Sequence, residues 1–240
     1  MHYIAEDKFV PGNLLFADSN ALRTTDGTTT FLIAGTNARF NIIHSFIQLS
    51  RSHIILTELH SHCLRGVDRT TNQTSIYSGN CTNRGDRNGV DALFTFPYSV
   101  IIDLMNSQQL IVSEASPGSL KTISTVSKSV STMYRDNTYK RTYLLQDPET
   151  GDIYVTIQHG VGLYDYQGNT FSVITGSFSN GFRDGEFSKL LFSYPQGLAF
   201  LSRSTLLVAD WYNHRLRVLD LTTNTSLSIC SGETGHSDGH

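Results

Sequence analysis

Apolar and polar residues alternate with a period of two along most of this chain, in short runs that often end in an acidic residue. In the clearest stretch, Leu206 and Val208 alternate with their neighbours, as do Leu216 and Val218 further on. A period of two predicts β-strands. Both faces of these strands are fairly apolar, which predicts sheets stacked against other sheets. No amphipathic run is long enough to predict a helix.

The strand pattern is repeated. Residues 52–79 match residues 205–232 from start to finish apart from a short insertion or deletion, and weaker copies occupy the rest of the chain. The equivalent ends of the second strand are positions 18, 58, 114, 156 and 210, spaced by 40, 56, 42 and 54 residues. This is the length of one four-stranded propeller blade, with an inserted loop where the spacing is longer. The predicted blades are residues 1–36, 42–81, 92–136, 141–176 and 190–232.

A second motif, Gly-x-x-Asp/Asn-Gly, occurs at Gly85–Gly89, Gly181–Gly185 and Gly235–Gly239. Glycine supplies positive φ angles, and Asp or Asn bonds to its own backbone, so the motif predicts a turn. The first two copies precede the two longer blades. The third predicts the start of a further repeat.

Three segments resemble the NHL repeat: Pro195-x-Gly-Leu-Ala199, Leu207-Val-Ala-Asp210 and Asn213-His-Arg-Leu-Arg217. The resemblance implies a β-propeller, usually of six blades. We therefore expect an all-β chain, with residues 1–240 forming a single NHL-like propeller of about five four-stranded blades plus the start of a sixth. We also expect it to belong to a longer protein, or to a ring closed unusually with five blades. Glu114-Ala-Ser and Thr156-Ile-Gln depart from the family pattern, so no shared ligand site is implied.

Charge argues against one known role of NHL propellers, RNA binding. Charged residues make up 16% of the chain and the net charge is −3. Neutralising phosphates requires clustered basic residues, whereas Arg203, Arg215 and Arg217 are the only tight group. We expect no nucleic-acid partner. No apolar run is long enough for a membrane span, and residues 1–12 lack the features of a signal peptide.

Cysteines and sequons indicate an extracellular or secreted setting. Cys63 and Cys81 each lie nine residues from the hairpin turn predicted near Asn72. Cross-strand Cβ atoms are about 4.5–5.5 Å apart, near the range for a disulfide, so these cysteines are predicted to be bonded; two thiols that merely share a blade are the alternative. Cys230 is predicted to be unpaired within the chain. Asn72, Asn80 and Asn224 begin Asn-x-Ser/Thr sequons and are predicted to carry N-glycans in a secreted protein.

Histidines and carboxylates raise a metal hypothesis. His60 and His62 would share one side of a strand, and His62 and His214 occupy the same repeat position. A relative of the NHL family, the peptide-amidating lyase, is a zinc enzyme, so a metal-dependent lyase is the alternative function. Zinc catalysis needs three converging ligands, and His159 falls out of register with His214. The recurring acids Asp18, Glu58, Glu114 and Asp210 are predicted to be structural, with Asp210 binding turn amides and Asn213 or Arg215. We expect no cofactor and no catalytic or metal-binding residue.

Loop residues are the remaining candidates. Arg84-Gly85-Asp86 is an integrin-type tripeptide, but Gly85 also begins a structural turn motif. His60, Arg183 and Trp211 differ between blades and fall in predicted loops, where propellers bind ligands. The sequence therefore favours a non-catalytic binding or structural module that contacts proteins or glycans through its loops. Self-association is a further possibility.

Overall fold

The computed structural model describes residues 3–35, 40–116 and 118–229. It contains two compact units, Met1–Lys140 (unit 1) and Arg141–His240 (unit 2). The predictions for Cys230 and for the third glycine motif at 235–239 lie outside the described residues.

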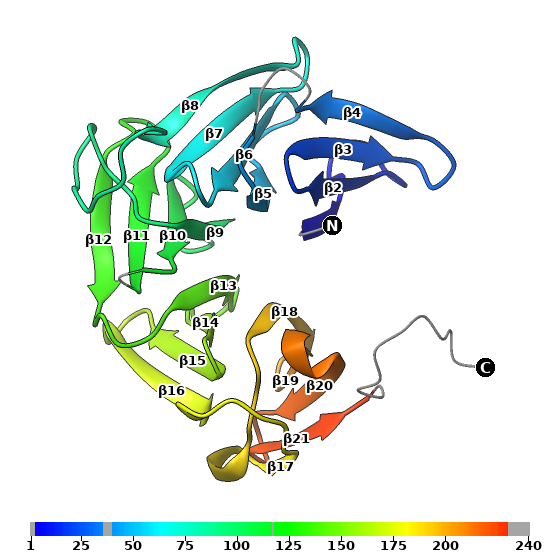
Figure 1. The fold of residues 1–240 in the computed structure, drawn as a ribbon, viewed down its shortest axis with the longest axis vertical. Coiled ribbons are helices and arrows are strands. Elements are labelled where there is room, and N and C mark those ends of the chain that lie inside the picture. Colours follow the sequence, from blue (N-terminus) through cyan, green and yellow to red (C-terminus); the bar gives the residue numbers. More distant parts are fainter. Residues whose placement is uncertain (1–2, 36–39, 117, 230–240) are drawn as a thin grey trace. The chain divides into compact units, whose positions relative to one another are not determined.

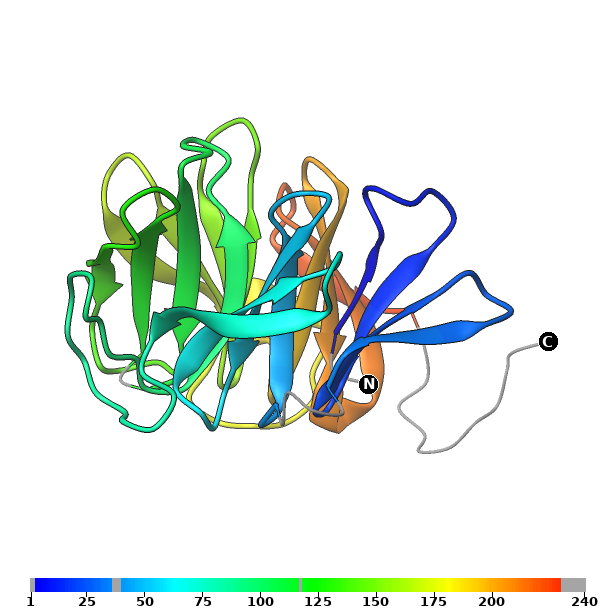
Figure 2. The same ribbon diagram turned by 90° about the horizontal axis from the view of Figure 1, so that it is seen from above.

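Unit 1 contains three antiparallel four-stranded sheets, blades 1 to 3, among its described residues (Figure 1). Figure 2 shows β1–β4 (blue) as a meander in which each strand turns back into the next. Blade 1 consists of β1 (Tyr3–Glu6), β2 (Leu14–Asp18), β3 (Ala21–Thr25) and β4 (Thr30–Ala34). Blade 2 consists of β5 (Ile43–Gln48), β6 (His53–Glu58), β7 (Cys63–Asp68) and β8 (Gln73–Gly79). Blade 3 consists of β9 (Pro97–Ile102), β10 (Gln109–Glu114), β11 (Ser119–Ser124) and β12 (Val130–Arg135).

Unit 2 contains two further blades among its described residues. Blade 4 consists of β13 (Arg141–Gln146), β14 (Ile153–Ile157), β15 (Gly160–Asp165) and β16 (Thr170–Gly176). Blade 5 consists of β18 (Pro195–Ser202), β19 (Thr205–Asp210), β20 (Arg215–Asp220) and β21 (Thr225–Ser228), with the short strand β17 (Gly185–Glu186) added to its outer edge. Two 3-10 turns, η1 (Phe187–Lys189) and η2 (Trp211–Asn213), complete the unit. The all-β class and the five four-stranded blades are confirmed.

The cores form where one sheet packs on the next, because the inner strands are apolar on both faces. In β6, Ile54 and Leu56 point into the core shared with blade 1, while Ile55 between them points into the core shared with blade 3. In unit 2, Leu206 and Val208 of β19 lie in the core between blades 4 and 5. The period of two in the sequence therefore assigns alternate residues to two buried faces, rather than to one buried face and one solvent-exposed face.

Equivalent turns have equivalent backbone conformations, which supports the repeat alignment. His62 and His214, the shared repeat position, have φ angles of 58° and 53°. Asn72 and Asn224, at the turn between the third and fourth strands, have φ angles of 56° and 54°. Asn is one of the few side chains that tolerates this left-handed region, and both turns use it.

The disulfide forms between the predicted partners, but through a different register. Cys63 and Cys81 are bonded, with 5.0 Å between their Cα atoms. The residue opposite Cys63 is Gly79, because Asp68 pairs with Gln73 and the hairpin is therefore centred between Thr70 and Thr71 rather than at Asn72; the bulge beside Leu64 shifts the partner of Cys63 by only one residue. Cys81 lies just beyond the end of β8, so the bond ties a loop to the start of β7 rather than joining two facing strand positions.

The glycine loops, defined as residues 85–89 and 181–185, have the same construction. Gly85 N–H donates to Phe94 O, and Gly181 N–H donates to Phe192 O. The far end of each loop reaches the outer strand of its own blade: Gly89 bridges to Val130 of β12, and Gly185–Glu186 pairs with β21. The motif predicted as a turn also covers a sheet edge. The described residues contain no helix with the length and apolar character that crossing a membrane requires.

Candidate binding surface

A buried ion pair joins the second and third strands of blade 5. Asp210 ends β19 and Arg217 lies in β20, and both side chains are fully buried. Arg217 Nη1 is 3.0 Å from Asp210 Oδ2, and Arg217 Nη2 is 2.9 Å from Asp184 Oδ1 in the glycine loop. Arg217 also donates to the Leu191 and Arg183 carbonyls. One cation therefore fixes the glycine loop to the sheet.

Blade 3 has the same arrangement with different residues. Lys121 Nζ lies 3.2 Å from Glu114 Oε2 and 3.0 Å from Asp86 Oδ1, and it donates to Leu93 O. Glu58 and Arg65 form a looser version in blade 2, at 3.4 Å. In each blade the cation follows the acid by seven residues, so the interaction belongs to the repeat.

The structural interpretation of the recurring acids is supported, but its details need correction. Asp210 accepts hydrogen bonds from the Ser193 amide and from Asn213 Nδ2, at 2.8 Å each. The amide therefore comes from the segment before β18, not from the following turn. The cation is Arg217, whereas Arg215 lies over the Phe182 ring.

In the Arg84-Gly85-Asp86 loop, the acidic group is engaged by two cations of blade 3. Asp86 is bound by Lys121 and by Arg135, whose guanidinium is in close contact with Asp86 Oδ2. Burial alone would raise the pKa of Asp86, but the hydrogen bonds and charges of these two cations lower it below its usual value. An integrin-type contact needs this carboxylate free for a receptor metal. The geometry instead favours a structural role for Asp86, with Arg84 left exposed.

Four rings form a continuous aromatic ladder at one end of blades 4 and 5: His159, Tyr194, Tyr212 and Trp211. The successive ring centroids are 4.8, 5.0 and 4.6 Å apart, and the first two contacts are edge-to-face. Tyr194 is 39% exposed, Trp211 52% and Tyr212 55%. Large rings that remain this exposed while in mutual contact form a preorganised apolar surface.

The ion pair of blade 5 positions this ladder. Asp210 holds the Ser193 amide, and the Ser193 carbonyl accepts a hydrogen bond from the Tyr212 amide. Tyr194 follows directly, with a φ of 50°, and its amide donates to Gln158 O. The three segments that carry the rings are thus hydrogen-bonded to one another through their backbones.

His159 forms the buried end of the ladder. Its residue exposure is 9%, and its Nδ1 has no hydrogen-bond partner within the described part of the chain. Burial lowers its pKa, and the charge of Asp210 opposes this shift. The neutral ring therefore packs as an apolar group against Tyr194.

The predicted loop residues fall in both units. Trp211 lies in η2, which Asn213 ties to the other glycine loop by donating to Gly181 O at 2.7 Å. Arg183 of that loop is exposed. His60 belongs to unit 1, where it is exposed in the turn between β6 and β7.

The expectation that His60 and His62 lie on a strand is wrong, because both belong to this turn. Their rings contact Phe96 edge-to-face, at 6.0 and 4.7 Å. His62 Nδ1 accepts a hydrogen bond from the Phe96 amide. Burial lowers the pKa of His62, with smaller effects of Arg84 and His60 in the same direction. Nδ1 of His62 therefore has a hydrogen-bond partner in the fold, the Phe96 amide.

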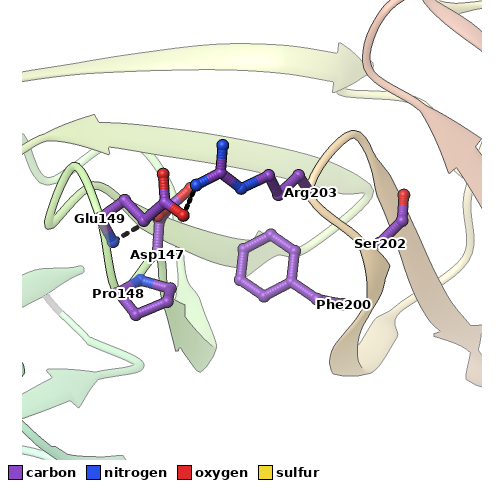
Figure 3. A pocket seen from close by; sticks show the side chains of 6 residues that line it. All are labelled: Asp147, Pro148, Glu149, Phe200, Ser202 and Arg203. Carbon is purple, nitrogen blue, oxygen red and sulfur yellow. Dashed lines mark hydrogen bonds and ion pairs between the residues drawn. The ribbon is translucent and has the colours of Figure 1, made fainter.

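A small hollow lies at the other end of blades 4 and 5 (Figure 3). Its volume is about 150 Å³, and it is lined by Asp147, Pro148, Glu149, Phe200, Ser202 and Arg203. An exposed ion pair between Arg203 and Glu149 spans its mouth. Drug-sized ligand sites measure about 300–1,000 Å³, so the aromatic ladder is the stronger candidate. Over the described ranges, no three His, Cys, Asp or Glu side chains gather in a way that could hold a metal ion.

Comparison with known proteins identifies the repeat. The NHL repeat family matches residues 192–219, which contain the first and second strands of blade 5 and all but the last residue of the third. The chain is a β-propeller that carries an NHL repeat in its fifth blade. Protein SUPPRESSOR OF QUENCHING 1, chloroplastic, from Arabidopsis thaliana is 39% identical over 66 residues, which is 27% of this chain and 6% of that protein.

Solved structures share the fold of this NHL propeller at low sequence identity. An auxiliary nutrient binding protein from Bacteroides thetaiotaomicron has a TM-score of 0.74 and 10% identity, over 95% of this chain and 56% of that one. A protein of the same description from Bacteroides ovatus has a TM-score of 0.72 and 12% identity, over 94% and 56%. A chain in a Nidogen/Laminin complex has a TM-score of 0.69 and 12% identity, over 95% and 77%. The chain thus spans little more than half the length of the two nutrient-binding proteins.

Proposed function

We propose that this NHL propeller is a non-catalytic binding module of an extracellular protein, and that it holds a protein partner against the aromatic ladder. The observation that carries the proposal is the exposure of Trp211, Tyr212 and Tyr194 in one connected set. Trp and Tyr are enriched among the residues that dominate binding energy at protein interfaces.

The rigidity of the ladder supports this function. Its segments are held by backbone hydrogen bonds and, through Ser193, by the buried Asp210–Arg217 pair. A surface that is already ordered loses little conformational entropy when a partner binds. Two of the structurally similar proteins are described as nutrient binding proteins and a third comes from a Nidogen/Laminin complex, which fits a binding role for this fold.

The extracellular setting rests on separate observations. The disulfide between Cys63 and Cys81 is of the kind that persists in oxidising compartments. The sequon residues Asn72 and Asn80 are exposed, as attachment of a glycan requires.

The test uses an arrayed panel of recombinant extracellular proteins, with a glycan array as a second arm. Wild-type protein and the variants Trp211→Ala and Tyr212→Ala are applied to both. Leu201→Ala is the matched control. Leu201 is 56% exposed but lies near the far end of β18, whereas the ladder residue Tyr194 directly precedes that strand. Loss of a hot-spot residue costs about 2 kcal/mol or more, which weakens affinity about 30-fold.

We expect a protein ligand whose affinity falls by that factor in both ladder variants and stays within about twofold in the control. A ligand found only on the glycan array would show that the partner is a glycan rather than a protein. Binding that survives both ladder substitutions would show that another surface is used.

A further inference from the structure

The outer strands of the blades differ in how their free edges are covered. In blade 3, Gly89 bridges to Val130 of β12. In blade 5, β17 pairs with β21. In blade 4, η1 lies beside β16, and Thr175 Oγ1 donates to Phe187 O. An uncovered edge presents unpaired N–H and C=O groups to other chains, and proteins usually block it.

Strand β8 of blade 2 lacks such a cover among the described residues, where its one strand neighbour is β7. It has seven residues, Gln-Thr-Ser-Ile-Tyr-Ser-Gly, and none is charged. Ile76 in its middle is 57% exposed. The other strand without a cover, β4, has five residues, and short edges are less prone to pair. The longest uncovered edge is therefore also uncharged.

Two sequons lie at the two ends of this strand. Asn72 directly precedes β8 and occupies the exposed tip of its turn, and Asn80 directly follows β8. Asn80 Oδ1 accepts hydrogen bonds from the Thr82 amide, the Thr82 hydroxyl and the Asn83 amide. These bonds order the side chain through its oxygen, while the amide nitrogen, the atom that carries a glycan, takes no part in them.

The third sequon is placed differently. Asn224 precedes β21, whose edge β17 already covers, and its carbonyl accepts a hydrogen bond from the Phe187 amide. The hydroxyl residue of this sequon, Ser226, is buried beside Asp184 and pairs with Gly185. Access to this sequon is restricted by the same segment that covers the strand.

We propose that N-linked glycans on Asn72 and Asn80 shield the free edge of β8, and that Asn224 remains unmodified. The inference rests on the extracellular setting proposed above. A glycan is bulky and polar, so one at each end of a seven-residue strand would keep another strand from pairing along it. Glycans would thus cover the outer edge of blade 2, as β17 covers the outer edge of blade 5.

The first measurement is site occupancy. The full chain, fused to a secretion signal, is produced in glycosylating eukaryotic cells and treated with a glycan-removing amidase in ¹⁸O water before peptide mass spectrometry. We expect the isotope label at Asn72 and Asn80 and its absence at Asn224. An unlabelled Asn72 and Asn80, or a label at Asn224 equal to theirs, would overturn the proposal.

The second measurement is association, which needs no binding partner. The variant Asn72→Gly/Asn80→Asp removes both glycans, while Gly keeps the positive φ and Asp keeps the oxygen of the Asn80 turn. By sedimentation, its mean mass should rise with concentration to about twofold the monomer mass or more. Adding Ile76→Lys should restore the monomer, whereas the control Val126→Lys, at a 73% exposed turn residue, should not.

The periplasm of bacteria supplies the same chain with its disulfide and without glycans. This material should associate like the double variant and respond to Ile76→Lys in the same way. Glycan-free protein that stays monomeric at every concentration would refute the shielding role. Ladder variants should leave occupancy and association unchanged, so failure of the proposed partner binding would be distinguishable from failure here.

Discussion

Arg217 and Asp210 form an ion pair in which neither side chain is exposed, with 3.0 Å between Nη1 and Oδ2. Removing one partner leaves the other charge buried, which costs about 3–5 kcal/mol. We expect Arg217→Met to lower the free energy of unfolding by that amount, measured by urea denaturation. The control is Arg203→Met, which breaks an exposed pair with Glu149 and should cost at most about 1 kcal/mol. Equal losses in both variants would contradict a structural role for the buried pair.

Asp86 should likewise contribute to stability rather than to adhesion. Asp86→Asn keeps the shape of the side chain but weakens its contacts with Lys121 and Arg135. We expect a loss of about 1–3 kcal/mol in unfolding free energy, and none for the exposed Arg84→Ala. Integrin-dependent cell attachment to immobilised protein should be absent for the wild type and for both variants. Attachment that disappears in both variants would restore the adhesion hypothesis.

The sequence was sufficient to predict the blades because its period of two and the spacing of the acids record which strand positions are buried. The fourth blade was predicted at 141–176, and β13–β16 cover the same residues. The partner of Asp210 was not predictable in this way. Arg217 alternates like any strand residue and faces Val208 across the hairpin, and only the folded structure brings its guanidinium to Asp184 and Asp210.

Only part of the aromatic ladder could be predicted from the sequence. Trp211 stood out as a single tryptophan after a strand-ending acid, and it is exposed. Nothing in the sequence distinguishes Tyr194 and Tyr212 from tyrosines that pack between blades. Tyr194 reaches the surface because its φ is 50° just before Pro195, a backbone conformation that no side-chain pattern records. The centre of the β7–β8 turn, which sets the residue opposite Cys63, is equally invisible to hydrophobic spacing.

Unfolding should become easier in strong acid. Asp7 is buried against Arg69, with 2.5 Å between Oδ2 and Nη2; burial would raise its pKa, but the hydrogen bonds and charge of Arg69 and the Phe9 amide lower it. Hydrogen bonds from the Thr29 amide and from Thr28 lower the pKa of Asp26 to about 2. A carboxylate with a depressed pKa in the folded state stabilises the fold above its unfolded pKa, about 3.9, and loses this contribution as pH falls through the folded value.

The contribution of Asp7 and Asp26 to stability should therefore be level above about pH 5 and fall between about pH 4 and pH 2. Urea denaturation across this range measures the slope, and carboxyl NMR titration should give Asp26 a pKa of about 2. Asp7→Asn should flatten the slope. A slope unchanged by that substitution would show that the Asp7–Arg69 contact does not contribute.

Fluorescence should report directly on the ladder, because Trp211 is the one tryptophan in the sequence. Its ring is 52% exposed and lies 4.6 Å from the Tyr212 ring. In free protein we expect emission typical of a partly hydrated indole, readily quenched by acrylamide.

Tyr212→Ala removes one wall of the indole site, so quenching of Trp211 by acrylamide should become more efficient. Phe31→Ala is the control, since Phe31 is 55% exposed and belongs to β4 of blade 1. A partner that binds the ladder should shift the emission to shorter wavelength and protect Trp211 from acrylamide. A partner that binds tightly yet leaves both signals unchanged must occupy another surface, which would transfer the binding role to different loops.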